Sequence, residues 1–299
     1  MSAAAATRVA LLTAAPARTV DEDLEPLRAA LGERGAEVAI TDWDDPTTDW
    51  RAFDRVVLRS TWDYTWRLTE FLERLDRIGA AARLSNPLPV VRWNCDKHYL
   101  GELVAAGLPV VPGVYVEPGA DPRAGLQSLR DMHGGYDEVV AKPCVGAGSR
   151  GARRLPAAAG DTVVAHVGEL QRQGHSVLLQ PYLPAVDHGG ETALLYFGGR
   201  FSHAIRKGPL LKTGQAPVRA LFAAEHIVPR VPAADELEAA AAILAALPFP
   251  GPLLYARVDL IRDATGRPRL LELELIEPSL FLGRAPGAAG RYADAILAR

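Results

Sequence analysis

AKPCVGAGSRG, residues 141–151, is the stretch on which the interpretation of the fold depends. It holds Gly146, Gly148 and Gly151 in the spacing G-x-G-x-x-G, and Lys142 stands four residues before the first glycine. A dinucleotide-binding turn would need these glycines to open a helix, and a Walker A loop would end in Gly-Lys-Ser/Thr. The residues that follow, ARRLPAAAG, indicate a short strand and then a loop. The stretch therefore predicts a flexible turn between two antiparallel strands.

A turn of this kind can bind phosphate groups. Its backbone N–H groups can cover triphosphate oxygens, while Lys142 neutralises charge on the α- and β-phosphates. The alternative is a solvent-exposed hairpin with a surface lysine, and the stretch alone does not separate the two.

Two acidic strands near the end of the sequence, ARVDLI and LLELELIEPS, are the other deciding feature. Because side chains alternate faces along a strand, Arg257 shares a face with Asp259, and Glu272 shares one with Glu274. If the intervening turn pairs these strands, three carboxylates converge on one patch of a leucine-rich sheet. Grouped carboxylates repel one another and need cations. Mg²⁺ shared with nucleotide phosphates is one source, and salt bridges from Arg257 or Arg206 are the other.

The first third of the sequence alternates strand and helix patterns. RVALLT, AEVAI and DRVVLRS predict three buried strands, with amphipathic helices at 21–34 and at about 68–78. This pattern is typical of a small parallel-sheet α/β unit, whose binding edge lies at the carboxyl ends of its strands. RSTWDYTW, residues 59–66, falls at that edge.

The rest of the sequence predicts a mixture of helices and antiparallel strands. The expected elements are a helix from Lys97 to about Gly107, strands at VPGVYV, EVVAKP and SVLLQPYL, a helix at 162–173, a hairpin about Gly198-Gly199, and an alanine-rich helix at 235–247. The segment 208–233 has poor periodicity and predicts a loop.

Composition narrows the class of protein. The 299-residue chain is 48% hydrophobic and 23% charged, and its formal charge of −3 gives no electrostatic reason to expect nucleic acid or an anionic membrane as partner. Its apolar runs fall short of the roughly 20 residues of a membrane-spanning helix. Cys95 and Cys144 form neither a disulfide framework nor a metal motif. We therefore expect a cytoplasmic protein with neither membrane nor nucleic acid as partner, and leave open whether it forms a homodimer.

The strand lysine, the glycine loop and the distal Asp…Glu-x-Glu set together resemble the ATP-grasp ligase superfamily over nearly the whole sequence. The layout is similar to that of glutathione synthetase and D-alanine–D-alanine ligase. The resemblance implies an α/β fold of the α+β ATP-grasp type, with ATP and Mg²⁺ as cofactors. It places a small N-terminal parallel-sheet α/β domain at 1–95, a central lid subdomain with the glycine loop at 96–182, and a C-terminal subdomain with the metal site at 183–299. Antiparallel sheets of the last two would clasp the nucleotide.

The same resemblance implies a set of nucleotide-binding residues. Lys97 matches the first nucleotide lysine of the superfamily, and Lys142 matches the second and contributes to catalysis. The other implied contacts are Gly146, Gly148, Ser149 and Gly151 over the phosphates, and Gln180, Tyr182 and Leu183 at the hinge that receives adenine. Asp187 and Glu191 are alternatives for the ribose hydroxyls.

The resemblance also implies the metal ligands and the reaction. Asp259, Glu272 and Glu274 match the metal ligands, although Glu274 stands where the superfamily often has asparagine. Arg206 matches an arginine near the reacting carboxylate, and Arg150 is a further implied catalytic residue. In the implied reaction a carboxylate attacks the γ-phosphate, and an amine then displaces phosphate from the acyl phosphate.

RSTWDYTW, RWNCDK and LELELIEPSLFL resemble a bacterial subgroup of stand-alone members, the O-ureido-D-serine cyclo-ligases. This implies that one small-molecule amino acid supplies both the carboxylate and the attacking nitrogen. The alternatives are a ligase that joins an amino acid to a second amino acid or peptide, a phosphotransferase, and a nucleotide-binding module without catalysis.

Within RSTWDYTW, Arg59 and Asp63 would bind the two charged termini of an amino acid, while Trp62 and Tyr64 would close its pocket. The further substrate candidates are Ser60, Thr61, Glu277 and Ser279. The simpler alternative for RSTWDYTW is a helix N-terminus, capped by Thr61 or Asp63, whose aromatic residues belong to the core.

Overall fold

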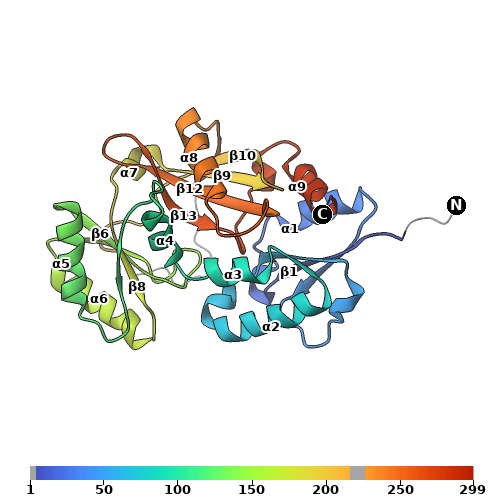
Figure 1. Ribbon diagram of the computed structural model, residues 1–299, viewed down its shortest axis with the longest axis horizontal. Helices are drawn as coiled ribbons and strands as arrows, with labels where there is room; N and C mark the ends of the chain where they lie inside the picture. The colour runs from blue at the N-terminus through green and yellow to red at the C-terminus, as the bar shows by residue number, and fades with distance from the viewer. Residues whose placement is uncertain (1–4, 216–225, 299) are drawn as a thin grey trace.

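The computed structural model describes residues 5–215 and 226–298, which form three sheets with helices packed against them (Figure 1). The first sheet is parallel and has the order β2-β1-β3-β4, from β1 (Arg8–Thr13), β2 (Glu37–Asp42), β3 (Arg55–Ser60) and β4 (Arg83–Ser85). Every residue of β1 and β3 after the first is buried, as their apolar runs predict. Helices α1 (Leu24–Gly32) and α2 (Leu68–Ala81) pack against this sheet. The predicted N-terminal α/β unit is confirmed.

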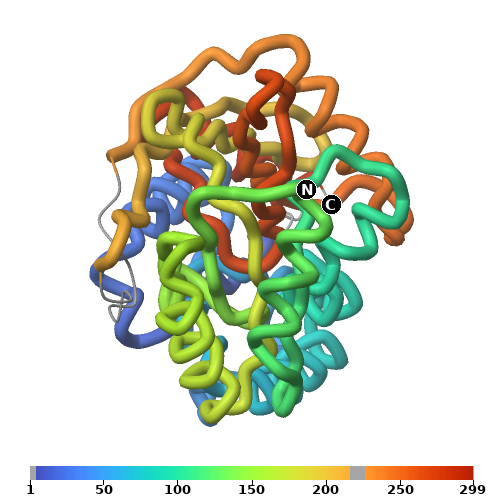
Figure 2. The backbone as a smooth tube through the Cα atoms, turned by 90° about the vertical axis from the view of Figure 1, so that its left-hand side faces the viewer, coloured from blue at the N-terminus to red at the C-terminus, as the bar shows by residue number. Residues whose placement is uncertain are grey.

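The second sheet is antiparallel and carries the glycine loop. Its order is β5-β8-β6-β7, from β5 (Val114–Val116), β6 (Glu138–Pro143), β7 (Arg153–Pro156) and β8 (Val177–Pro181). Helices α5 (Pro122–His133) and α6 (Gly160–Arg172) lie side by side over it, and Figure 2 shows both in front of the sheet. The turn between β6 and β7 contains the glycines, so the antiparallel hairpin predicted for this stretch is confirmed.

The third sheet is also antiparallel and carries the acidic strands. Its order is β11-β10-β9-β12-β13, from β9 (Glu191–Phe197), β10 (Arg200–Lys207), β11 (Ile227–Arg230), β12 (Tyr255–Arg262) and β13 (Pro268–Glu274). Asp259 lies opposite Glu272, and Arg257 lies opposite Glu274. The expected pairing of the acidic strands is therefore confirmed.

Helices on the two faces of the third sheet join it to the rest of the molecule. α8 (Ala234–Ala245) contacts β13, while α9 (Ala288–Leu297) contacts β9, β10 and α1. Phe197, Ile205 and Tyr292 share one core cluster with the strands of the parallel sheet. The N-terminal unit is thus fixed against one face of the sheet that bears the carboxylates.

Some elements differ from the sequence-based expectations. The helix expected from Lys97 is shorter, as α4 (Tyr99–Ala105), and a separate α3 (Leu88–Asn94) precedes it. β11 lies in the segment 208–233, where only a loop was expected, because its backbone pairs with β10; residues 216–225 of that segment lie outside the described residues. The remaining short helices are α7 (Ala185–Gly189) and the 3₁₀ turns η1 (Ala15–Ala17), η2 (Trp50–Ala52), η3 (Trp62–Trp66) and η4 (Leu282–Arg284).

Two predictions concern the chain as a whole. The three sheets occupy residues 8–85, 114–181 and 191–274, and the domain boundaries after 95 and after 182 stay predictions. Among the described residues, no helix has the length and apolar character that crossing a membrane requires.

Candidate active site

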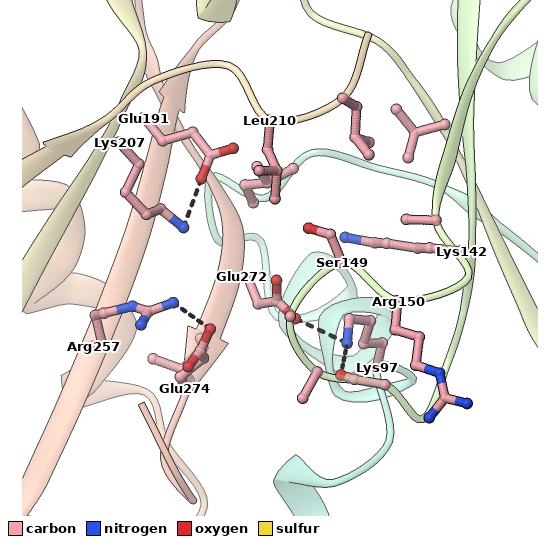
Figure 3. A pocket seen from close by; sticks show the side chains of 18 of the residues that line it. Lys97, Lys142, Ser149, Arg150, Glu191, Lys207, Leu210, Arg257, Glu272 and Glu274 are labelled. Carbon is pink, nitrogen blue, oxygen red and sulfur yellow. Dashed lines mark hydrogen bonds and ion pairs between the residues drawn. The ribbon is translucent and has the colours of Figure 1, made fainter. Parts of the chain in front are cut away.

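A cavity is lined by strands of the two antiparallel sheets and by η3 and α3, which follow strands of the parallel sheet (Figure 3). β6 and the glycine loop form one wall, and β12 and β13 form the wall opposite. The end of β8 and Leu183 line one end, while η3, α3 and residues 277–281 line the other. The cavity therefore lies at the meeting point of every segment that the sequence singled out.

Both predicted lysines point into this cavity. Lys97 lies just before α4 and is 7% exposed, and its Nζ contacts the Gly146 carbonyl at 2.9 Å and Glu272 at 2.8 Å. Burial alone would lower the pKa of Lys97, but the Glu272 carboxylate outweighs it and raises the pKa. Burial lowers the pKa of Lys142, and the Lys97 charge adds to that effect. Two adjacent lysines on one wall, Lys97 buried and Lys142 half-buried, provide a site for an anion.

The carboxylates of the opposite wall each contact a cation. Asp259 is fully buried, accepts from Arg257 at 2.9 Å and from Lys207 at 2.6 Å, and does not line the cavity. Burial would raise its pKa, but Arg257 and Lys207 hold the pKa below the ordinary value. Glu272 and Glu274 do line the cavity, and Glu274 pairs with Arg257.

The two cavity carboxylates differ in proton affinity. Burial would raise the pKa of Glu272, but Lys97 and Lys142 lower it to about 2. For Glu274 burial prevails over the Arg257 charge, and the pKa rises to about 7. Arg257, one of the two alternative cation sources considered from the sequence, pairs with Asp259 and Glu274. In the described part of the chain, Arg206 pairs with neither of them.

The glycine loop covers the cavity in a conformation that its residues permit. Gly148 and Gly151 have φ of +61° and +72°, where glycine has no steric penalty. Gly146, Gly148 and Ser149 line the cavity, whereas Gly151 does not. Arg150 lines it only in part, because its guanidinium lies 3.9 Å over the ring of Trp66. In Figure 3 that guanidinium points away from the carboxylates, so the expectation that it acts at the reacting atoms is not supported.

The hinge end of the cavity combines apolar walls with a polar side chain. Gln180 is 2% exposed, its Nε2 donates to the Val111 carbonyl at 2.8 Å, and its Oε1 has no hydrogen-bond partner in the described part of the chain. The apolar lining comes from Tyr182, Leu183, Val186, Leu210, Leu211, Ile261 and Leu271. A flat heterocycle with an amino group fits such a slot.

The structure separates the two ribose candidates. Asp187 accepts from Arg154 at 3.0 Å and from the Tyr182 hydroxyl at 2.5 Å, and it does not line the cavity. Glu191 does line it and contacts Lys207 at 2.8 Å. Glu191 is therefore the candidate that faces a bound ligand.

RSTWDYTW divides into structural residues and cavity residues. Arg59 is fully buried and donates to the Pro278 carbonyl at 3.2 Å, and Asp63 accepts from the Trp43 indole at 2.8 Å. Neither lines the cavity, so the expectation that they bind the two termini of an amino acid is wrong. Both charged side chains bind other groups of the protein, because β3 and η3 direct them into the protein interior and not into the cavity.

The remaining residues of that stretch follow the same division. Ser60 is buried and hydrogen-bonded to Thr13 at 2.7 Å, and Thr61 is buried at the start of η3, so neither lines the cavity. Trp62 and Tyr64 do line it, as do Glu277 and Ser279. The Trp62 indole donates to the Glu277 carbonyl at 2.9 Å, which joins the two groups of substrate candidates.

Known proteins resemble this chain over its full length. A family model described as "D-cycloserine synthetase DcsG, N-terminal domain" matches residues 9–86. The chain is 39% identical to the cycloserine biosynthesis protein DcsG of Streptomyces lavendulae, over 97% of this chain and 98% of that protein.

The chain belongs to the DcsG family.

Solved structures place this DcsG-family member among the ATP-grasp ligases. The crystal structure of D-cycloserine synthetase DcsG matches with a TM-score of 0.89 and 38% identity, over 98% of this chain and 99% of that one. The ATP-grasp ligase PsnB, solved with a minimal precursor, Mg and ADP, matches with a TM-score of 0.64 and 22% identity over 100% and 98% of the two chains, which shows a shared fold. The protein is thus an ATP-dependent ligase that forms carbon–nitrogen bonds.

Sequence reasoning missed one cation of this DcsG-family site. Arg206 was expected near the reacting carboxylate, but its side chain contacts the His188 carbonyl at 3.4 Å and does not line the cavity. Its neighbour Lys207 lines the cavity instead, between Glu191 and Asp259. Neighbouring residues in a strand face opposite sides, so only one of the two can point inward. Ala204 is buried together with His203 and Ile205, so no alternation in this strand separates Arg206 from Lys207 in the sequence.

Proposed function

We propose that this DcsG-family ligase closes O-ureido-D-serine into D-cycloserine, with conversion of ATP to ADP and phosphate and release of CO₂ and ammonia. The observation that carries the proposal is one continuous cavity, in which Lys97 and Lys142 face Glu272 and the far end is lined by Arg257 and Glu277. Similarity to DcsG over nearly the whole chain supports the choice of substrate.

The nucleotide end of the cavity fits ATP. The Oε1 of Gln180, which has no partner among the described residues, is an acceptor for the exocyclic amine of adenine. Lys97 and Lys142 would neutralise the phosphates, and the N–H groups of the glycine loop would cover them. Glu191 would bind the ribose hydroxyls. Each of these roles uses a group that already lines the cavity.

The acidic wall fits a divalent cation. Glu272 and Glu274 both line the cavity, and Mg²⁺ takes a few carboxylate oxygens together with phosphate oxygens. When bound there, Mg²⁺ would offset negative charge on the phosphates. Asp259 stays a proposed third ligand, but its oxygens are engaged by Arg257 and Lys207, so one of these cations would have to move.

The residues of this chain would act by positioning and by charge rather than by covalent attack. The substrate carboxylate attacks the γ-phosphorus, and the bond from that phosphorus to ADP breaks. The ureido nitrogen bonded to oxygen then attacks the acyl carbon and loses its proton, and phosphate leaves. One water hydrolyses the carbamoyl group to CO₂ and ammonia. Arg257 would orient the carboxylate, while the glycine loop, Trp62 and Tyr64 would exclude bulk water from the acyl phosphate.

The direct test supplies the enzyme with ATP, Mg²⁺ and O-ureido-D-serine and measures ADP release, with mass spectrometry of the product. We expect ADP release that depends on O-ureido-D-serine alone and yields D-cycloserine. D-Serine and D-alanine serve as controls that carry the carboxylate without the ureido nucleophile. ADP release that requires a second amine would instead establish a ligase of two separate substrates, and a stable phosphorylated product would establish a phosphotransferase.

A further inference from the structure

Glu277 differs from the other carboxylates that line the cavity. Glu191 contacts Lys207, Glu272 contacts Lys97 and Glu274 contacts Arg257. Within residues 5–215 and 226–298, by contrast, no lysine, arginine or histidine lies within ion-pair distance of Glu277. The neutral hydroxyl of Tyr64 interacts with Glu277 and lowers the pKa of its carboxyl against the larger effect of burial.

The backbone around Glu277 is held in place from several directions. The Trp62 indole donates to the Glu277 carbonyl at 2.9 Å, and the Tyr255 hydroxyl donates to the carbonyl of the preceding Ile276 at 2.6 Å. Arg59 donates to the Pro278 carbonyl at 3.2 Å. A binding group needs this kind of support, because a loose carboxylate would lose conformational entropy on capturing a ligand.

The environment of Glu277 favours a cation that is not part of the protein. The residue is 9% exposed, and burial, together with the nearby Glu274 charge, raises the pKa of Glu277 to about 8. A buried carboxylate without a cation is costly, and an ammonium group placed against it would remove that cost. The cavity gives such a group access, because Glu277 belongs to its lining.

The opposite charge lies on the same stretch of wall. Arg257 donates to the carbonyl of Ser279, two residues from Glu277, at 3.1 Å, and Arg257 and Ser279 also line the cavity. An α-amino acid carries its carboxylate and its ammonium on one carbon. Arg257 of β12, which contacts the loop that carries Glu277, and the Glu277 carboxylate together match that arrangement.

We propose that Glu277, oriented by Tyr64 and Trp62, binds the α-ammonium group of the amino-acid substrate while Arg257 receives its carboxylate. This assignment rests on the proposed function. It replaces Arg59 and Asp63, which the structure uses internally, with a pair that faces the cavity. It also predicts that the enzyme rejects substrates that lack an amino group.

The test compares two substrates on two enzymes. O-Ureido-D-serine and its des-amino analogue, 3-(ureidooxy)propanoic acid, are given to the wild type and to Glu277→Gln, and kcat and KM for ADP release are measured. In the wild type, loss of the amino group should lower kcat/KM at least about 30-fold, the effect of removing one partner of a buried charge pair. With O-ureido-D-serine, the kcat/KM of Glu277→Gln should fall by a similar factor, mainly because KM rises. The kcat/KM values of this variant for the two compounds should differ by no more than about twofold.

The controls separate binding from folding and from proton transfer. Glu73→Gln, an exposed carboxylate on α2, should behave as the wild type. Circular dichroism checks that the variants fold. If Glu277→Gln does not fold, Glu277→Asp is used in its place. Because Glu277→Asp keeps the charge, it should still discriminate between O-ureido-D-serine and the des-amino analogue. A fall in kcat for both compounds, with the wild-type discrimination intact, would overturn the assignment.

The outcomes also distinguish this assignment from the proposed function. If the wild type releases ADP with O-ureido-D-serine but accepts the des-amino analogue equally well, the ammonium site is wrong and the proposed reaction stands. If the wild type releases no ADP with O-ureido-D-serine, the proposed function fails, and this assignment fails with it.

Discussion

Replacement of Glu277 by glutamine should stabilise the folded protein in the absence of substrate, and increasingly so as the pH rises. Burial raises the pKa of Glu277 from 4.5 to about 8. The folded state therefore keeps the proton at pH values where the unfolded state has released it. Folding stability is lost between those two pKa values as the pH rises, whereas a glutamine cannot ionise.

The magnitude follows from the shift. Each pKa unit corresponds to about 1.4 kcal/mol, so the free energy of unfolding of Glu277→Gln should gain about 2 kcal/mol on the wild type between pH 5 and pH 7. Urea unfolding of both proteins at pH 5, 6 and 7, followed by circular dichroism, measures this difference. The gain should be small near pH 4.5, where the carboxyl is protonated in both states.

A difference in unfolding free energy that does not change with pH would refute the reasoning. It would mean that Glu277 ionises normally in the folded protein, through a cation or water that lowers its pKa. The result bears on function as well. A residue that lowers the free energy of unfolding when its site is empty is best explained by a role in binding a ligand.

Three further outcomes follow from the contacts of the site. Lys142→Ala should reduce kcat for ADP release at least about 100-fold without lowering the free energy of urea unfolding, because the residue neutralises phosphate charge. An unchanged kcat would show that Lys142 does not bind the phosphates. Glu272→Gln should raise the Mg²⁺ concentration needed for half-maximal activity at least about tenfold, and an unchanged Mg²⁺ titration would remove its assignment as a ligand. Arg59→Met should lower the free energy of urea unfolding by about 3 kcal/mol, since it removes one partner of a buried group of charges, while Arg51→Met on the surface should leave that free energy unchanged.

The arrangement of strands could be predicted because it depends on local patterns. Alternation along β12 and β13 predicted that Asp259, Glu272 and Glu274 converge if the strands pair, and the strands do pair. The glycines between β6 and β7 indicated a hairpin rather than a helix start. Lys142 could be predicted for a related reason, because it stands at the end of the strand that leads into the glycine turn, whereas Lys97 was implied by the resemblance to the ATP-grasp superfamily.

The direction of single side chains could not be predicted equally well. Arg59 and Asp63 looked available for a ligand, but tertiary contacts with Pro278 and Trp43 use both of them, and neither partner is close in sequence. The sequence could not decide between Asp187 and Glu191 for the ribose hydroxyls, whereas in the structure Asp187 is engaged by Arg154 and Tyr182. These choices depend on long-range packing, which residue type and spacing do not specify.

A crystal structure of the full chain with Mg²⁺ and a non-hydrolysable ATP analogue tests the central claim most directly. The account predicts phosphate oxygens within about 3 Å of Nζ of Lys97 and of Lys142, adenine beside Gln180, and Mg²⁺ bound to Glu272 and Glu274. A nucleotide bound outside this cavity, or phosphates that contact neither lysine, would contradict it.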